Sequence, residues 1–103
     1  MMAQIEIPRD ELSKFCVRWR IEELSLFGSV LRDNFRSDSD VDILVKFQPD
    51  AEPTLFDLVR MQDELQRLFG RTVDLVSRRG IEASRNYLRR NAILNSAEVV
   101  YGS

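Results

Sequence analysis

The N-terminal half of the chain changes between helical and strand-like spacing of its apolar residues. Segment 8–20 has apolar residues three and four positions apart, and Pro8 suits a first helical turn, so we expect a helix there. The apolar face of this helix consists of Leu12, Phe15, Cys16 and Trp19. Residues 23–27 predict a short strand ended by Gly28, and residues 29–35 a helical turn. Residues 40–47, rich in β-branched side chains, form the clearest strand.

A second helix is expected after the proline-containing loop 48–53. Thr54 is a favourable N-cap, and Asp57 stands three residues later, where a capping box has its acidic residue. Gly70 is expected to end the helix as a C′ glycine. The apolar stripe that we expect to face the core consists of Leu55, Leu58, Val59, Leu65, Leu68 and Phe69.

The C-terminal third adds one more strand and one more helical segment. Residues 72–77 predict a short strand, and residues 82–96 a mainly helical segment with a break near Asn91. Residues 98–101 fit either a terminal strand or a continuation of that helix. Strands alternating with helices indicate an α/β (α+β) fold with helices packed on a sheet. We expect one domain over residues 1–103.

Composition narrows the chemistry that is open to the chain. Hydrophobic residues make up 44% and charged residues 31%, as in globular domains, and neither a membrane span nor a secretion signal is visible. We therefore expect a cytoplasmic protein without membrane contact. The net charge of −2 argues against direct binding of nucleic acid. The absence of histidine excludes His-based catalysis, and the single cysteine, Cys16, is expected in the core.

Two aspartates one residue apart, Asp40 and Asp42, open the clearest strand. Residues i and i+2 of a strand face the same way, so the two carboxylates share one face. The opposite face, which we expect to be the core face, consists of Val41, Ile43, Val45 and Phe47. Two charges about 7 Å apart repel by roughly 2 kcal/mol at an effective dielectric constant of ~20, and a shared cation removes this cost. Oxygen ligands alone favour Mg²⁺, with Mn²⁺ as the alternative.

A third aspartate and a glycine–serine turn fit the same chemistry. If the strand with Asp74 pairs beside the first, Asp74 could complete the acidic cluster, bind metal and take a proton from an attacking hydroxyl. Gly28 allows backbone to approach a phosphate closely, and the Ser29 hydroxyl adds a donor. Arg32 could reach a phosphate oxygen with its guanidinium group.

Each of these features has a simpler explanation when it stands alone. An Asp-x-Asp pair is most often a solvated turn, and a Gly-Ser turn by itself is weak support for any site. A calcium loop beginning at Asp38 would need Gly and Glu where Ile43 and Pro49 stand, so we set it aside. A basic run, more simply explained as a solvated helix face than as a site, consists of Arg78, Arg79, Arg85, Arg89 and Arg90.

In combination, the stretches FGSVLRDNFRSDSDVDILV and RTVDLVS resemble the motifs of the minimal nucleotidyltransferases (MNT) of the DNA polymerase β superfamily. The resemblance extends to the leading helix, to LFDLVRMQDELQRLFGR and to AILNSAEVVY, and so covers nearly the whole chain. It implies a small mixed β-sheet flanked by helices, the minimal polymerase β-type nucleotidyltransferase fold. One departure is Asp33, where many members of the family have glycine.

The resemblance also implies a site and a reaction. Gly28 and Ser29 would hold a nucleoside triphosphate, Asp40 and Asp42 would bind two Mg²⁺ ions, and Asp74 would be the third acidic position. The enzyme would transfer a nucleoside monophosphate, AMP from ATP, to a hydroxyl with loss of pyrophosphate. Similar proteins are commonly antitoxins whose partner is a HEPN-domain ribonuclease. The implied acceptor is a tyrosine of that toxin, and we expect a hetero-oligomer with it.

Two other functions fit the same residues. The protein could neutralise its toxin by binding alone, although keeping three like charges without using them is costly. It could also transfer the nucleotide to a small molecule, as the related aminoglycoside nucleotidyltransferases do. Those enzymes carry an extra domain for the acceptor, and 103 residues leave little room for one. Nucleotide preference, acceptor residue and oligomeric state are not determined by the sequence.

Overall fold

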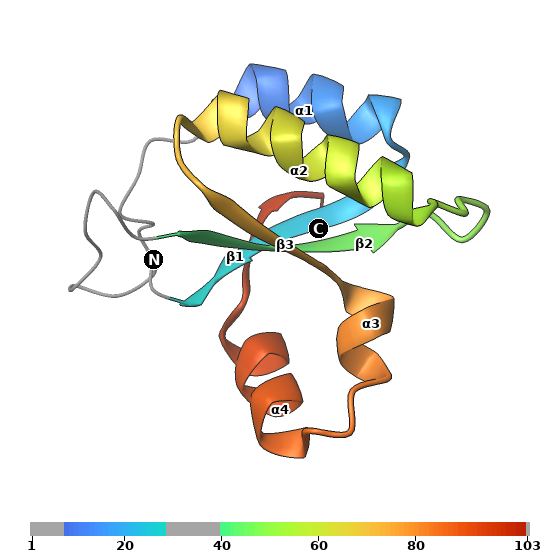
Figure 1. Ribbon diagram of the computed structural model, residues 1–103, viewed down its shortest axis with the longest axis vertical. Coiled ribbons are helices and arrows are strands. Elements are labelled where there is room, and N and C mark those ends of the chain that lie inside the picture. Colours follow the sequence, from blue (N-terminus) through green and yellow to red (C-terminus); the bar gives the residue numbers. More distant parts are fainter. Residues whose placement is uncertain (1–7, 29–39, 103) are drawn as a thin grey trace.

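A four-stranded mixed sheet with helices on both faces forms the architecture (Figure 1). The computed structural model describes residues 8–28 and 40–102. Its elements are α1 (Arg9–Arg18), β1 (Ile21–Phe27), β2 (Val41–Phe47), α2 (Leu55–Phe69), β3 (Val73–Ser77), α3 (Arg78–Glu82), α4 (Tyr87–Ser96) and β4 (Glu98–Tyr101). The strand order is β3-β2-β1-β4, with β1 antiparallel to both neighbours and β2 parallel to β3. The expected α/β fold with a mixed sheet is confirmed.

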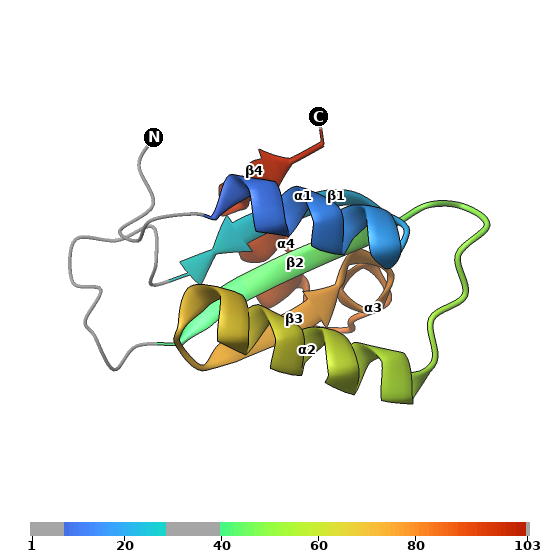
Figure 2. The same ribbon diagram turned by 90° about the horizontal axis from the view of Figure 1, so that it is seen from above.

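Helices α1 and α2 lie side by side over one face of the sheet (Figure 2). The main core between them and the strands consists of Leu12, Phe15, Cys16, Ile21, Leu24, Leu26, Val41, Ile43, Val45, Met61, Leu65 and Val73. The expected core face of β2 is confirmed, with Phe47 only partly buried at its end. Burial raises the pKa of the Cys16 thiol to about 12, so this cysteine stays protonated in the core.

The ends of α2 are built as the sequence predicts. The Thr54 hydroxyl accepts a hydrogen bond from the Asp57 amide at 3.2 Å, and the Asp57 carboxylate accepts one from the Thr54 amide at 2.9 Å. Gly70 ends the helix in the left-handed conformation, with φ 66°. These two bonds satisfy amides that the first turn of a helix leaves without intrahelical partners.

The apolar stripe predicted for α2 is partly wrong. Leu55 and Val59 are 73% and 67% exposed, whereas Met61, which the stripe omitted, is fully buried beside Leu65. An α-helix turns by about 100° per residue, so Val59 lies on nearly the opposite side of the helix from Met61. The buried stripe therefore follows Met61, Leu65 and the partly buried Leu58.

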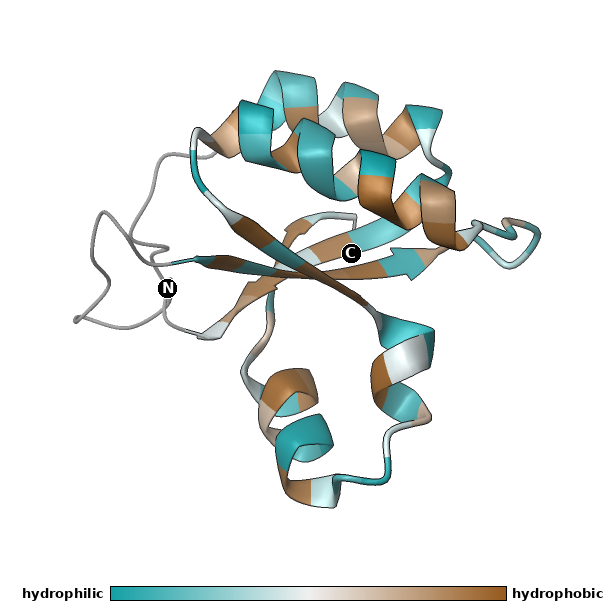
Figure 3. Ribbon diagram, in the orientation of Figure 1, coloured by the Kyte–Doolittle hydropathy of each residue, from teal (hydrophilic) through white to brown (hydrophobic). Residues whose placement is uncertain are grey.

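Helices α3 and α4 cover the other face of the sheet (Figure 1). A second, smaller core under them consists of Phe27, Leu44, Ile81 and Ile93. Figure 3 shows the strands coloured largely as hydrophobic, whereas the helices carry hydrophobic and hydrophilic residues. A sheet that is covered on both faces has apolar residues on both sides of its strands, and this explains why Leu44 is buried although it shares a face with Asp42.

The prediction for residues 82–96 is wrong in its details. The Ser77 hydroxyl accepts a hydrogen bond from the Gly80 amide and starts α3, so the helical structure begins at Arg78. The Asn86 side chain accepts from the Arg89 amide and starts α4 as a separate helix. The break therefore lies between these helices, not near Asn91. The basic run consequently spans two helices rather than one helix face. Residues 98–101 form a strand, the first of the two predicted possibilities.

The longest of the described helices, α2, has 15 residues. None of the helices within residues 8–28 and 40–102 is long and apolar enough to cross a bilayer.

Candidate functional site

Asp42 and Asp74 are neighbours across the parallel pair formed by β2 and β3. The register pairs Val41 with Val73, Asp42 with Asp74 and so on along the strands. Neighbouring strands lie about 4.8 Å apart, and side chains at paired positions project from the same face. Asp42 is half-buried and Asp74 is exposed. The condition that the sequence left open, that the strand with Asp74 lies beside the strand with Asp42, is therefore met.

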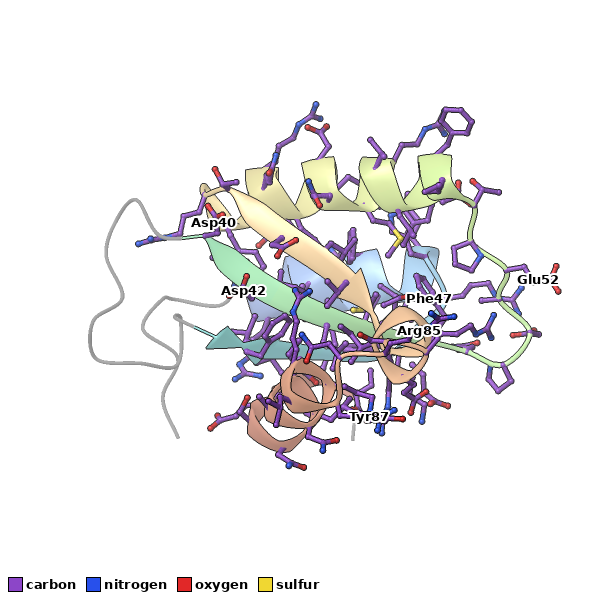
Figure 4. All side chains as sticks on the ribbon, turned by 60° about the horizontal axis from the view of Figure 1, so that its bottom comes forward. Asp40, Asp42, Phe47, Glu52, Arg85 and Tyr87 are labelled. Atoms are coloured by element: carbon purple, nitrogen blue, oxygen red, sulfur yellow. The ribbon has the colours of Figure 1, made fainter. Side chains whose placement is uncertain are left out.

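The two aspartates project from the face of the sheet that α3 and α4 cover. Leu44 and Val76, two positions further along their strands, pack into the small core under those helices. Residues two positions apart share a face, so Asp42 and Asp74 lie on the same side, near where β2 and β3 begin. Asp40 directly precedes β2 and is exposed. Figure 4 shows Asp40 and Asp42 together at this end of the sheet.

Gly28 lies against the carboxylate of Asp42. It follows Phe27, which pairs with Asp42 in the antiparallel register of β1 and β2. Gly28 has φ +76°, and a Cβ built on it would stand 2.2 Å from Oδ2 of Asp42. A side chain at this position is therefore disfavoured both by the backbone and by the neighbouring carboxylate. Contact with Asp42 is a reason for glycine that sequence reasoning missed, and the phosphate contact stays a prediction.

The register brings two carboxylates close together at this end of the sheet. Carboxylates at the spacing of neighbouring strands, about 4.8 Å, repel by roughly 3 kcal/mol at an effective dielectric constant of ~20. Among the described residues, no group of three or more His, Cys, Asp or Glu side chains is arranged to hold a metal ion. Mg²⁺ is usually bound by one or two carboxylates together with water and substrate phosphates. Asp42 and Asp74 could supply the two carboxylates of such a coordination shell. Metal binding by Asp40, Asp42 and Asp74 stays a prediction.

The remaining predicted nucleotide contacts lie outside the described residues. Ser29 and Arg32 both belong to the segment between β1 and β2 that the structure does not describe. The same holds for the helical turn expected over residues 29–35 and for Asp33 and Asp38. The roles of Ser29 and Arg32 therefore stay predictions.

A pocket of about 570 Å³ lies at the opposite end of β2 from the aspartates. It is lined by Glu22, Val45, Lys46, Phe47, Pro49, Ala51, Glu52, Pro53, Leu58, Ser77, Arg78, Arg79 and Glu82. Figure 4 shows Phe47 and Glu52 far from Asp40 and Asp42. Its charges largely pair with each other, because Lys46 contacts Glu22 at 2.9 Å and Arg78 contacts Glu82 at 3.3 Å. Chemistry at the aspartate end, rather than in this pocket, stays a prediction.

Comparison with known proteins identifies relatives of the chain. The profile of the family described as Nucleotidyltransferase domain matches residues 9–100. A Thermococcus cleftensis protein named protein adenylyltransferase MntA is 36% identical over 66 residues, which cover 64% of this chain and 65% of that protein. A Methanocaldococcus jannaschii protein named as a candidate protein adenylyltransferase is 36% identical over 77 residues, covering 75% of this chain and 76% of that protein. The match thus spans slightly less than two thirds of the first relative.

Solved structures share the fold. A structure named as a candidate minimal nucleotidyltransferase has 37% identity and a TM-score of 0.67, covering 87% of this chain and 86% of that one. A toxin–antitoxin complex with AMP-PNP gives 17% identity and a TM-score of 0.71, covering 94% and 75%. A complex of a tri-AMPylated Shewanella oneidensis HEPN toxin with an MNT antitoxin gives 18% and 0.63, covering 92% and 70%. Because the two complexes are only 17% and 18% identical to this chain, their likeness to it shows a shared fold and nothing more.

Proposed function

Since this chain belongs to the family described as Nucleotidyltransferase domain, we propose that it is a nucleotidyltransferase that transfers AMP from ATP to a tyrosine of a HEPN-domain ribonuclease toxin and so acts as its antitoxin. The proposal rests chiefly on the register that sets Asp42 beside Asp74, with Gly28 against Asp42. The names of the two relatives support AMP as the group and a protein as the acceptor. The toxin–antitoxin complexes of the same fold support the partner.

The donor set proposed for the metal is made of carboxylates only. Asp40, Asp42 and Asp74 would hold Mg²⁺, with Mn²⁺ as a substitute, because hard oxygen ligands suit these ions. When bound, two such ions would neutralise the negative charge of the triphosphate and of the leaving pyrophosphate. Gly28, Ser29 and Arg32 would contact the phosphates of ATP.

The proposed step is an in-line displacement at the α-phosphorus of ATP. The tyrosine oxygen forms a bond to this phosphorus, and the bond from phosphorus to the bridging oxygen of pyrophosphate breaks. Pyrophosphate leaves with the electron pair of that bond. The phenolic proton, whose ordinary pKa is about 10, passes to the carboxylate of Asp74. Such a transfer depends mainly on positioning and charge neutralisation and requires no histidine.

The test uses ATP labelled at the α-phosphate, Mg²⁺ and the purified HEPN toxin. We expect label on the toxin with α-labelled ATP and none with γ-labelled ATP, because only the AMP portion is transferred. Asp42→Asn keeps the size of the side chain but removes its charge, and we expect the rate to fall by about 100-fold or more. Asp63→Asn is the matched control, since Asp63 lies on the exposed side of α2 and pairs only with Arg67 in the described residues.

Two results would contradict the proposal. The wild-type protein could bind the toxin without labelling it, or Asp42→Asn could label it as fast as Asp63→Asn does. If Asp42→Asn also inhibits the ribonuclease as well as the wild type does, neutralisation by binding alone is the correct description.

A further inference from the structure

One lobe of the molecule has a net positive charge, whereas the rest of the chain has a net negative charge. Residues 78–90 hold five arginines and one glutamate, a net charge of +4, so the remaining residues carry −6 of the total of −2. In the fold these residues form α3, the link and the first turn of α4, on one side of the sheet (Figure 1). We call α3, the link and α4 the α3–α4 lobe. Charges of one sign that are gathered on one surface create a field that attracts the opposite sign.

Several arginines of the α3–α4 lobe have no ionic partner within the described residues. Arg78 is used internally, because it contacts Glu82 at 3.3 Å and Glu23 at 3.9 Å. The guanidinium of Arg90 lies over the ring of Tyr87, 4.8 Å from its centroid. Arg79, Arg85 and Arg89 form no ion pair with any acidic residue that the structure describes, and all three are exposed. The lobe therefore offers arginines that the described part of the chain does not pair with carboxylates.

Exposed apolar side chains lie among these arginines. Leu88 is 85% exposed and Tyr87 is 66% exposed, both in the first turn of α4. Ile93, which packs into the small core, lies five positions after Leu88 and so on nearly the opposite side of the helix. Burying a leucine is worth roughly 1.5–3 kcal/mol, and here the fold does not gain it. Aromatic and arginine side chains around an apolar centre are typical of protein interfaces.

The chemistry of the α3–α4 lobe favours a protein over a nucleic acid. Binding of nucleic acid depends on many contacts between basic side chains and phosphates. This lobe has three arginines without an ionic partner among the described residues, and the rest of the chain has a net negative charge. The apolar side chain of Leu88 gains little from contact with the charged phosphates of a nucleic acid. An apolar depression ringed by Asp and Glu side chains matches both the leucine and the arginines.

We propose that the α3–α4 lobe docks the acceptor protein, through an apolar, acid-rimmed depression on that protein. This inference rests on the proposed function for the identity of the partner. The lobe covers the face of the sheet from which Asp42 and Asp74 project, and its Arg79 lies toward the other end of β2 from these carboxylates. A partner docked there would be held on the same face of the sheet as the proposed site.

The test compares two matched double variants for binding to the purified HEPN toxin by titration calorimetry. The lobe variant is Leu88→Ser/Arg89→Glu, and the control is Phe56→Ser/Arg60→Glu on α2. Phe56 is 81% exposed, Arg60 is exposed, and both lie on the opposite side of the sheet. Both variants make the same change in charge, and each replaces one exposed apolar side chain by serine. Thermal melting of both verifies that they stay folded.

We expect the lobe variant to bind the toxin about tenfold or more weakly than the wild type, because a few residues at the centre of an interface, arginines often among them, dominate affinity. The control should stay within about threefold, as exposed residues outside an interface do. The affinity of the wild type should fall as salt rises. Equal affinities of the lobe variant and the control would overturn the proposal. Binding of transfer RNA that is lost on Arg89→Glu, with unchanged toxin binding, would assign the lobe to RNA instead.

Failure of this proposal is separable from failure of the proposed function. Asp42→Asn should bind the toxin like the wild type, because Asp42 lies outside the α3–α4 lobe. Binding by the wild type without label transfer would contradict the function and leave docking supported. Normal binding and labelling by the lobe variant would contradict docking and leave the function supported. No binding by the wild type would overturn both.

Discussion

Alanine in place of Gly28 should disturb both the fold and the carboxylate of Asp42. With φ +76°, alanine at this position costs roughly 1–2 kcal/mol relative to glycine. Its Cβ would also stand 2.2 Å from Oδ2 and 3.1 Å from Cγ of Asp42, so the carboxylate must rotate away. Holding a side chain off its preferred rotamer costs about 0.5–1.5 kcal/mol more. We expect Gly28→Ala to lower the free energy of unfolding by roughly 1.5–3.5 kcal/mol in all.

Gly70 provides a matched control for the backbone part of this effect. It has φ +66°, and a Cβ added to it meets nothing within 4 Å. Gly70→Ala should therefore lose only the backbone contribution, about 1–2 kcal/mol, and should leave the rate of nucleotidyl transfer unchanged. Gly28→Ala should lose stability beyond this and should also transfer AMP more slowly, because the displaced carboxylate is one of the proposed metal ligands. Urea denaturation measures the stabilities, with midpoints fitted as a two-state transition.

A double-mutant cycle isolates the contact between Gly28 and Asp42. In Asp42→Ala the carboxylate is gone, and the nearest atom to the new Cβ is Cβ of residue 42, at an ordinary contact distance of 3.5 Å. The excess cost of Gly28→Ala over Gly70→Ala should then disappear, which gives a coupling of about 0.5–1.5 kcal/mol. If Gly28→Ala and Gly70→Ala are equally destabilising in the wild-type background, the close approach of Gly28 to Asp42 is wrong.

Three further predictions concern the core and the helix cap. Met61→Ala should lower the free energy of unfolding by about 2–5 kcal/mol, because Met61 is fully buried. Val59→Ala, at an exposed position, should change it by no more than about 0.5 kcal/mol in the same urea titration. Equal effects of the two changes would contradict the burial of Met61 rather than Val59 against the sheet. Thr54→Ala should cost about 1 kcal/mol, since it removes the hydroxyl that accepts from the first turn, and an unchanged urea midpoint would contradict the capping box. Burial raises the pKa of the Cys16 thiol to about 12, so this cysteine should react with a thiol-specific reagent at pH 8 only after urea unfolds the chain. Labelling at the same rate without urea would contradict its burial.

Features that depend on neighbours in the sequence could be predicted well. The capping box at Thr54 and the helix end at Gly70 involve residues three or fewer positions apart, or a single backbone conformation. The faces of β2 follow from the two-residue period of a strand, so Val41 and Ile43 could be placed in the core.

Other features depend on what lies across the fold. The apolar residues of α2 can be grouped into more than one apolar face with helical spacing. Which face packs on the sheet depends on the tertiary structure, and Met61 rather than Val59 is buried. Ser77 caps the start of α3 and Asn86 caps the start of α4, so the segment forms two helices. Neither cap was predicted from the sequence, because the arginines around these residues favour helix. The sequence could assign Asp74 to a face, but pairing with Asp42 requires the parallel register of β2 and β3, which joins segments more than 30 residues apart.

The decisive measurement is a cycle of transfer rates with Asp42→Asn, Asp74→Asn and the double variant, using α-labelled ATP and the HEPN toxin. Groups that act as one unit are strongly non-additive in their effects on rate. If Asp42 and Asp74 form a single site across β2 and β3, each single change should slow transfer by about 100-fold or more, and the double variant should be little slower than the worse single variant. Losses that multiply in the double variant, or full activity of Asp74→Asn, would contradict a shared site.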